Sequence, residues 1–186
     1  MSYALWLRKY SLITQGKSRS AIKVLGIDPG SINCGYGLIG IERKEPVYIT
    51  SGRISVPSSK PLHIRLKTIF ETLIDVISNY QPDDIAIEKI FFAKGAKAAL
   101  SLGHARGVVL LAATSGNAAI HEYSALQVKQ AVVGYGRAEK QQVQEMVKMS
   151  LKIKGSLYPD SADALALALC HMNTIKFNEA LKNSKR

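Results

Sequence analysis

The sequence predicts an α/β protein with a mixed five-stranded sheet flanked by helices. The first third holds three β-like runs joined by short, turn-rich links, which is typical of an antiparallel meander. Later β-like runs alternate with helical stretches that are long enough to be crossovers between parallel strands. The chain has 186 residues, of which 47% are hydrophobic and 21% are charged, so it can bury the core of one soluble domain.

The meander strands are expected at residues 22–28, 35–41 and 47–54, with Pro29-Gly30 in the first turn. Residues 62–80 place apolar side chains at helical spacing, and Gln81-Pro82-Asp83 ends that helix. The remaining predicted elements, in chain order, are a strand at 84–88, a helix at 95–113, a strand at 118–123, helices at 124–133 and 139–153, and a helix at 160–175 preceded by Pro159.

These elements predict one folded domain over residues 21–175. Residues 1–20 mix short apolar pieces with basic and polar residues, so we expect an N-terminal extension outside the fold. Residues 176–186 are polar and basic and are expected to form a tail. Gly103 and Gly107 interrupt an apolar helix and predict a place where another backbone packs closely.

The composition is strongly basic, with 25 Lys and Arg against 14 Asp and Glu and a net charge of +11. This surplus indicates a polyanionic partner, and a basic solvated surface without a specific partner is the alternative. No apolar run reaches the roughly 18 residues that span a bilayer, so a membrane protein is not expected. Cys34 and Cys170 lack metal-ligand spacing and are interpreted as small buried side chains of a cytoplasmic protein.

Two acidic residues stand at the ends of predicted buried strands. Asp28 ends the first strand and precedes Pro29-Gly30, and Glu88 ends the strand at 84–88. Asp-Pro-Gly alone is ordinary turn chemistry, and a lone acid after a strand is often merely exposed. Catalytic groups, however, are best held on rigid elements, so the interpretation depends on further acids downstream.

Asp160 and Asp163 supply these further acids, three residues apart in the first turn of the last helix. Asp160 could be a helix N-cap, whereas Asp163 belongs to an otherwise apolar helix and needs a partner. If the helix crosses the ends of the two strands, four carboxylates converge. Such a group requires cations, and its oxygen ligands favour Mg²⁺ or Mn²⁺. Two ions could then stabilise the attacking and leaving oxygens of a phosphodiester displacement.

The same residues belong to a longer ordered pattern. The sequence resembles the RuvC family of bacterial Holliday-junction resolvases, which have a ribonuclease H-like fold. The resemblance covers about residues 22–173, and any one of its motifs is weak while the ordered set is specific. The matching motifs are Leu25-Gly26-Ile27-Asp28-Pro29-Gly30, Gly35-Tyr36-Gly37, Ala86-Ile87-Glu88, Leu102-Gly103, Ala105-Arg106-Gly107, Gln127-Val128-Lys129-Gln130, Ala138-Glu139-Lys140 and Asp160-Ser161-Ala162-Asp163-Ala164-Leu165-Ala166.

The resemblance implies a homodimer that binds a four-way DNA junction and nicks two strands symmetrically beside the RuvA–RuvB branch-migration complex. It implies two Mg²⁺ ions per active site, bound by the catalytic acids Asp28, Glu88, Asp160 and Asp163. It also implies DNA-binding roles for Phe91, Arg106, Lys129 and Lys140. We hypothesise that Lys140 or Lys129 neutralises charge on the scissile phosphate.

Other interpretations remain open at the level of the sequence. Without the resemblance, Phe91 would be a core or dimer-contact residue, and Lys129 and Lys140 would be solvated. A non-catalytic nucleic-acid-binding module would explain the charge, and a broader nuclease of the same fold would explain the acids. Actin-like ATPases share the Gly-Ile-Asp-Pro-Gly-Ser loop but need a second lobe, for which the chain has no room. The histidines at 104, 121 and 171 are expected to be structural rather than metal ligands.

Overall fold

The computed structural model describes residues 22–43, 45–89 and 95–184 and contains a five-stranded mixed sheet. The strand order is β3-β2-β1-β4-β5. Strands β1, β2 and β3 form an antiparallel meander, and β4 and β5 continue the sheet in parallel with β1. The predicted fold class is therefore confirmed. The strand bounds are Ile22–Asp28 for β1, Asn33–Glu42 for β2, Glu45–Ser55 for β3, Asp84–Glu88 for β4 and Ala119–Tyr123 for β5.

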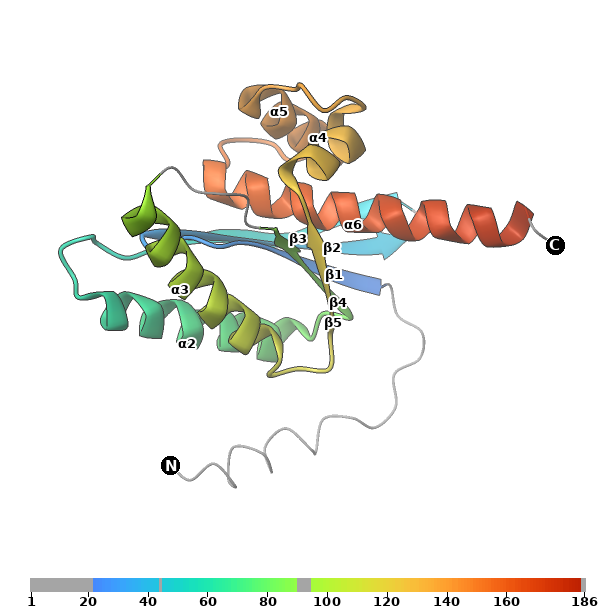
Figure 1. Cartoon of the computed structure of the whole chain (residues 1–186). Helices are drawn as coiled ribbons and strands as arrows, with labels where there is room; N and C mark the ends of the chain where they lie inside the picture. Colours follow the sequence, from blue (N-terminus) through green and yellow to red (C-terminus); the bar gives the residue numbers. More distant parts are fainter. Residues whose placement is uncertain (1–21, 44, 90–94, 185–186) are drawn as a thin grey trace.

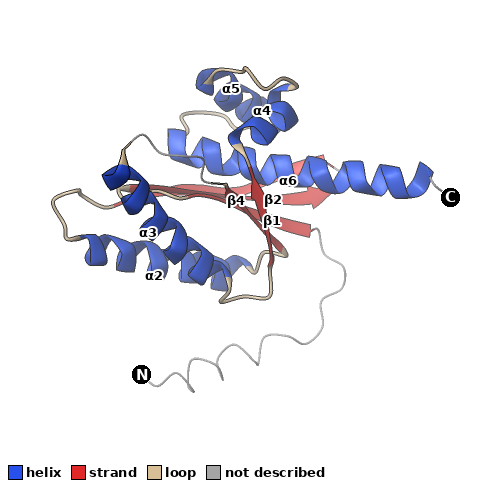
Figure 2. Cartoon of the chain, in the orientation of Figure 1, coloured by secondary structure: helices blue, strands red, loops and turns tan. Residues whose placement is uncertain are grey.

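Helices cover both faces of the sheet. Helices α2 and α3 pack together on one face, while α6 crosses the other face and carries α4 and α5 on its outer side (Figures 1 and 2). No helix in the described part of the chain is both long and apolar enough to cross a membrane. The helix bounds are Leu62–Tyr80 for α2, Ala96–Ala113 for α3, Ala125–Val133 for α4, Lys140–Ser150 for α5 and Pro159–Ser184 for α6.

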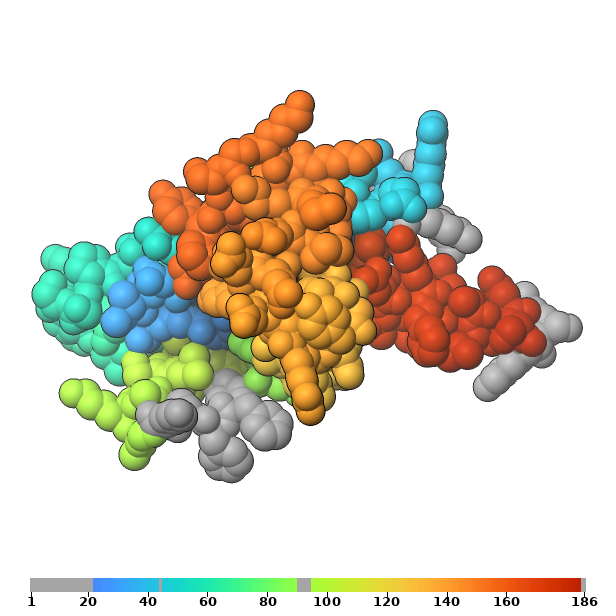
Figure 3. Space-filling view, turned by 90° about the horizontal axis from the view of Figure 1, so that it is seen from above, coloured from blue at the N-terminus to red at the C-terminus, as the bar shows by residue number. Residues whose placement is uncertain are grey.

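The last helix is longer than the sequence indicates. The helix predicted at 160–175 continues to Ser184, through most of the segment that is expected to form the basic tail. This segment leaves the body of the protein and is exposed (Figure 3). Its Glu, Ala, Leu and Lys residues have high helix propensity, and Lys182 complements the helix dipole in the last turn. The polar composition of residues 177–184 therefore indicates that this part of the helix is exposed, not that the helix has ended. The expected extension at residues 1–20 lies outside the described residues.

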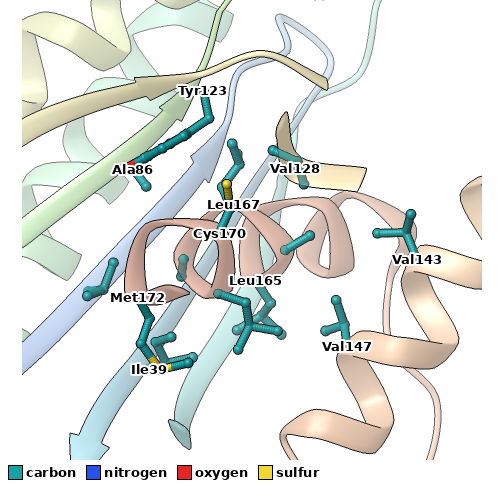
Figure 4. Packing of buried hydrophobic residues seen from close by; sticks show 14 of the residues in the cluster. Ile39, Ala86, Tyr123, Val128, Val143, Val147, Leu165, Leu167, Cys170 and Met172 are labelled. Carbon is teal, nitrogen blue, oxygen red and sulfur yellow. The ribbon is translucent and has the colours of Figure 1, made fainter. Parts of the chain in front are cut away.

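Alternation along the strands divides the core into two hydrophobic clusters. In β1, Leu25 and Ile27 pack towards α2 and α3, whereas Val24 belongs to the cluster on the α6 face. In the cluster on the α6 face, α6 lies between the sheet on one side and helices α4 and α5 on the other (Figure 4). Because side chains alternate with a period of two, Asp28 shares the α6 face with Val24. The same rule places Glu88 on the α6 face with Ala86.

Glycines allow α6 to lie directly on the backbone of the sheet. A Cβ atom built on Gly26 would lie 1.8 Å from the carbonyl oxygen of Ala164, and one on Gly35 would lie 1.9 Å from that of Asp160. Any side chain at either position would push the helix away from the sheet. The two glycines therefore determine how close the first turns of α6 come to the ends of β1 and β2.

We expect Gly26→Ala to destabilise the protein by about 1–3 kcal/mol or more, because the added methyl group overlaps the α6 backbone. Gly40→Ala is the matched control, since a Cβ there meets the Ile49 side chain at an ordinary 3.5 Å. Denaturant unfolding followed by circular dichroism measures both changes. Equal stability of the two variants would contradict the proposed contact.

Candidate active site

The ends of two neighbouring strands place Asp28 beside Glu88. Strands β1 and β4 pair in parallel, with Ile27 opposite Ile87, so the next residue, which is the last of each strand, lies at the same end of the sheet. Both side chains lie on the α6 face by strand alternation. This arrangement follows from the chain order and from the central position of β1 in the sheet.

The first turns of α6 bring further carboxylates to this edge. Asp163 joins Asp28 and Glu88 in the lining of one pocket of about 430 Å³. Lys129 of α4 and Lys140 of α5 line the same pocket. Its remaining walls are apolar and consist of Ala125, Val128, Val143, Ala166 and Leu167. Three acids and two lysines, drawn from five elements, thus share one water-accessible hollow.

Asp160 lies at the margin of this group rather than in the pocket lining. Its carboxylate oxygen is 3.9 Å from Nη1 of Arg53, and the Arg53 guanidinium also lies 4.3 Å from the centre of the Tyr158 ring. The charge of Asp160 nevertheless contributes to raising the pKa of Asp28. Among the described residues, no three of the four acids bring oxygen atoms within 4.8 Å of one another. The contact between Arg53 and Asp160 was not predicted, because Arg53 belongs to none of the sequence motifs.

Crowding of negative charge changes the titration of the acids. Burial, followed by the charges of Asp163 and Glu88, raises the pKa of Asp28 to about 7. Burial and the charge of Asp163 also raise the pKa of Glu88. These shifts mean that the ionised site is unfavourable without additional positive charge.

Lys140 supplies part of that positive charge. Its Nζ atom donates a hydrogen bond to Oδ2 of Asp163 at 2.5 Å. Burial lowers the pKa of Lys140, but the hydrogen bond and the charge of Asp163 outweigh burial and leave the pKa above its ordinary value. Lys140 begins α5, where the backbone N–H of Glu139 donates to the Gln142 side chain at 2.8 Å. The lysine is therefore charged and held at a capped helix end.

The donor set of the pocket fits hard divalent cations. Its acidic side chains offer carboxylate oxygens, the ligands that Mg²⁺ and Mn²⁺ prefer. A divalent ion would offset the repulsion that raises the pKa of Asp28. Asp28, Glu88 and Asp163 would hold such ions, with Asp160 beside them.

The guanidinium of Arg106 is bonded to other residues of this chain. Its Nη1 donates to the backbone oxygen of Glu88, and its Nη2 bonds Oε1 of Glu122 at 2.6 Å. The side chain is only 14% exposed. Arg106 thus fastens the end of β4, which carries Glu88, to β5, and a DNA-binding role for it stays a prediction. Phe91 lies outside the described residues.

Comparison with known proteins gives a consistent result. Residues 24–171 match the family model described as crossover junction endodeoxyribonuclease RuvC. Proteins of that name from Shewanella piezotolerans and Saccharophagus degradans are 50% and 51% identical over 151 residues, covering 81% of this chain and 87% of each relative. The structure of Thermus thermophilus RuvC in complex with Holliday junction substrate superposes with a TM-score of 0.79 at 31% identity, covering 84% of this chain and 96% of that one.

We expect the metal-free protein to lose stability as the pH rises from about 4 to about 7. The folded state holds the Asp28 proton to about pH 7, whereas the unfolded chain releases it near the ordinary value of 3.8. The folded state therefore binds more protons within this window, and unfolding becomes easier as the pH increases. Asp28→Asn should flatten this dependence and stabilise the chelated protein at pH 8 by on the order of 1–2 kcal/mol.

Urea unfolding at pH 5 and pH 8 in the presence of chelator measures this effect. Asp75→Asn, which removes an exposed carboxylate on α2, is the control and should leave the pH dependence as it is. A wild-type protein that is more stable at pH 8 than at pH 5 would argue against a protonated Asp28.

Proposed function

This chain belongs to the RuvC family of crossover junction endodeoxyribonucleases, and we propose that it cuts four-way DNA junctions with divalent cations held in the carboxylate pocket. The observation that carries the proposal is the meeting of Asp28, Glu88 and Asp163 with Lys129 and Lys140 in one hollow. We further propose that Asp160 completes the acid set and that two Mg²⁺ ions, or Mn²⁺ in their place, bind there.

The residues of the pocket have distinct roles in this proposal. Bound divalent ions supply stabilisation of the attacking and leaving oxygens of an in-line phosphodiester displacement. The carboxylates of Asp28 and Glu88, on rigid strand ends, position that charge. Lys140 holds Asp163 in place and, being 61% exposed, can reach a phosphate at the mouth of the pocket. Lys129 stands on the α4 side and would contact the same strand.

Binding of the junction rests on the charge of the whole chain. The net charge of +11 attracts the phosphate backbone through counterion release, while the acidic pocket repels it until cations are bound. Binding and cutting should therefore separate experimentally. A non-catalytic binding module would account for the basic charge, but it does not require half-buried carboxylates that repel one another. The carboxylates favour the nuclease.

We also propose that the protein acts as a homodimer joined through α3. This helix is rich in Ala, Leu and Val, and it leaves the side chains of Leu100 and Leu111 63% and 61% exposed. Gly103 lies on the same stripe, since residues three to four apart share a helix face. No atom of the described chain lies within 4 Å of a Cβ built on Gly103 or Gly107, so the expected close backbone packing does not occur within one chain. A second copy of the stripe fits this surface.

The proposed partner complex follows from the family, and the proposed compartment also takes the two cysteines into account. We place the enzyme in the cytoplasm beside the RuvA–RuvB complex, because RuvC resemblance implies that assembly and both cysteines are free and buried. Co-elution with RuvA–RuvB on a synthetic junction is the measurement, and separate elution would count against the assembly.

Single-turnover cleavage of a synthetic four-way junction with Mg²⁺ tests the catalytic roles. Asp28→Asn should retain junction binding and lower cleavage by about 10²–10³-fold, because it removes a charge that holds the cations. Lys140→Ala and Lys129→Ala should each slow cleavage if the lysine neutralises the scissile phosphate, and unchanged rates would remove that hypothesis. Exposed Lys67→Ala on α2 is the matched control and should cut at the wild-type rate.

Linear duplex DNA is the substrate control in this experiment. Paired nicks confined to the junction support a resolvase. Equal cutting of junction and duplex would indicate a broader nuclease of the same fold, and no Mg²⁺-dependent cutting at all would indicate a binding module.

Leu111→Lys should convert the dimer to a monomer, because the lysine charge would be buried in the self-complementary stripe. Met149→Lys on α5, where the methionine is 71% exposed, is the control and should remain dimeric. Sedimentation equilibrium gives the mass of each variant. A dimeric Leu111→Lys protein would exclude this face as the interface.

A further inference from the structure

A second group of ligand-type side chains lies on the α6 face, at the opposite end of the sheet from the carboxylate pocket. Asp84 begins β4, His121 lies within β5, and His171 lies within α6. Strand alternation directs Asp84 to the same face as Glu88, four residues away. His171 lies about 12 Å along the helix axis from Asp163. The group is therefore separate from the proposed active site.

The three side chains converge on one point. Nε2 of His121 lies 3.2 Å from Oδ1 of Asp84, and Nε2 of His171 lies 3.3 Å from Oδ2 of the same carboxylate. The two imidazole rings stack with their centroids 4.1 Å apart. Each residue offers one ligand atom, and these atoms all lie within 4.8 Å of one another. This is the one such group of three or more within the described residues.

The buried member of the group has an unused nitrogen. The His171 side chain is 4% exposed, and its Nε2 makes no hydrogen bond despite the nearby carboxylate. A buried polar atom without a partner costs free energy, so its direction into this group calls for a ligand. Burial, followed by the neighbouring His121, lowers the pKa of His171, which disfavours the charged imidazolium.

The other nitrogen of His171 is already oriented. Nδ1 lies 2.6 Å from the hydroxyl of Tyr123, the last residue of β5. In the tautomer in which Nδ1–H donates to that hydroxyl oxygen, Nε2 carries a lone pair that faces Asp84. Metal-bound histidines commonly use the second ring nitrogen in this way, to fix the tautomer and the ring orientation.

We propose that Asp84, His121 and His171 bind one transition-metal ion of the Zn²⁺ class, distinct from the ions of the carboxylate pocket. Ligand atoms held at about 2.0–2.1 Å in a tetrahedron lie about 3.3 Å apart, and each imidazole nitrogen already lies at about this distance from one of the two oxygens of Asp84. Two imidazoles and one carboxylate form a set that Zn²⁺ accepts and that Mg²⁺, which prefers oxygen ligands, does not. His121 is 38% exposed and opens the site to solvent, which leaves room for water as the fourth ligand.

The sequence alone indicated structural roles for these histidines, because no short spacing joins them. Their ion would connect β4, the edge strand β5 and α6. Since Ser124 caps α4 directly after β5, the ion would stabilise the segment that leads to Lys129. The site does not depend on the proposed nuclease activity, so either proposal can fail without the other.

Imidazole ¹⁵N NMR of the full chain tests the site during titration with Zn²⁺ in excess Mg²⁺, which occupies the carboxylate pocket. The chain has four histidines, so His63 and His104, which are exposed, serve as internal controls. The Nε2 resonances of His121 and His171 should shift at one equivalent of Zn²⁺, while those of His63 and His104 stay in place. A uniform response of all four imidazoles, or none, would overturn the proposal.

Variants give a second, independent measurement. His121→Ala and Asp84→Asn should each lower the Zn²⁺ affinity at least about tenfold in competition with a chromophoric chelator, while His104→Ala should leave it unchanged. Asp84→Asn keeps the size of the side chain, so the test remains valid if His121→Ala is unstable. Unaltered affinity in both ligand variants would exclude the site.

Discussion

Direct contact between α6 and the glycines of the sheet is the constraint on which the rest of the structure depends. Gly26 and Gly35 carry no Cβ, so the helix backbone lies against the strand backbone. A layer of ordinary side chains would hold the helix several ångströms further away and lift Asp160 and Asp163 from the ends of β1 and β4. The geometry of the site therefore depends on the missing side chains of Gly26 and Gly35 as well as on the acids themselves.

The close approach has an electrostatic cost that explains the lysines of the pocket. Burial and the neighbouring negative charges raise the pKa of Asp28 to about 7 and also raise the pKa of Glu88. Lys140 offsets part of this repulsion through Asp163, and divalent cations would offset the rest. Repulsion among these carboxylates would destabilise the metal-free protein, and bound cations would relieve that repulsion. Arg106 supports it from outside by fastening the end of β4 to β5.

The carboxylate pocket and the group of Asp84, His121 and His171 share two elements, strand β4 and helix α6. Asp84 and Glu88 lie on the same face of β4 because four residues separate them. Asp163 and His171 are eight residues apart in α6, about 2.2 turns, so His171 lies about 12 Å further along the helix and is rotated by about 80° from Asp163. The oxygen ligands of the carboxylate end would suit hard cations, whereas the histidine end would suit a softer metal. One sheet–helix interface thus holds both the pocket and the proposed second metal site.

The sequence by itself determined the strands, the helices and the positions of Asp28 and Glu88, because hydrophobic periodicity and turn residues are local properties of the chain. It also placed Asp160 and Asp163 in one helical turn. It did not show that residues 176–184 continue α6, since solvent exposure ends a hydrophobic pattern without ending a helix. Only the tertiary structure joined His121 to Asp84 across 37 residues and His171 to Tyr123 across 48. Such contacts depend on which strands become neighbours, and sheet order is decided by packing of the whole domain rather than by any segment alone.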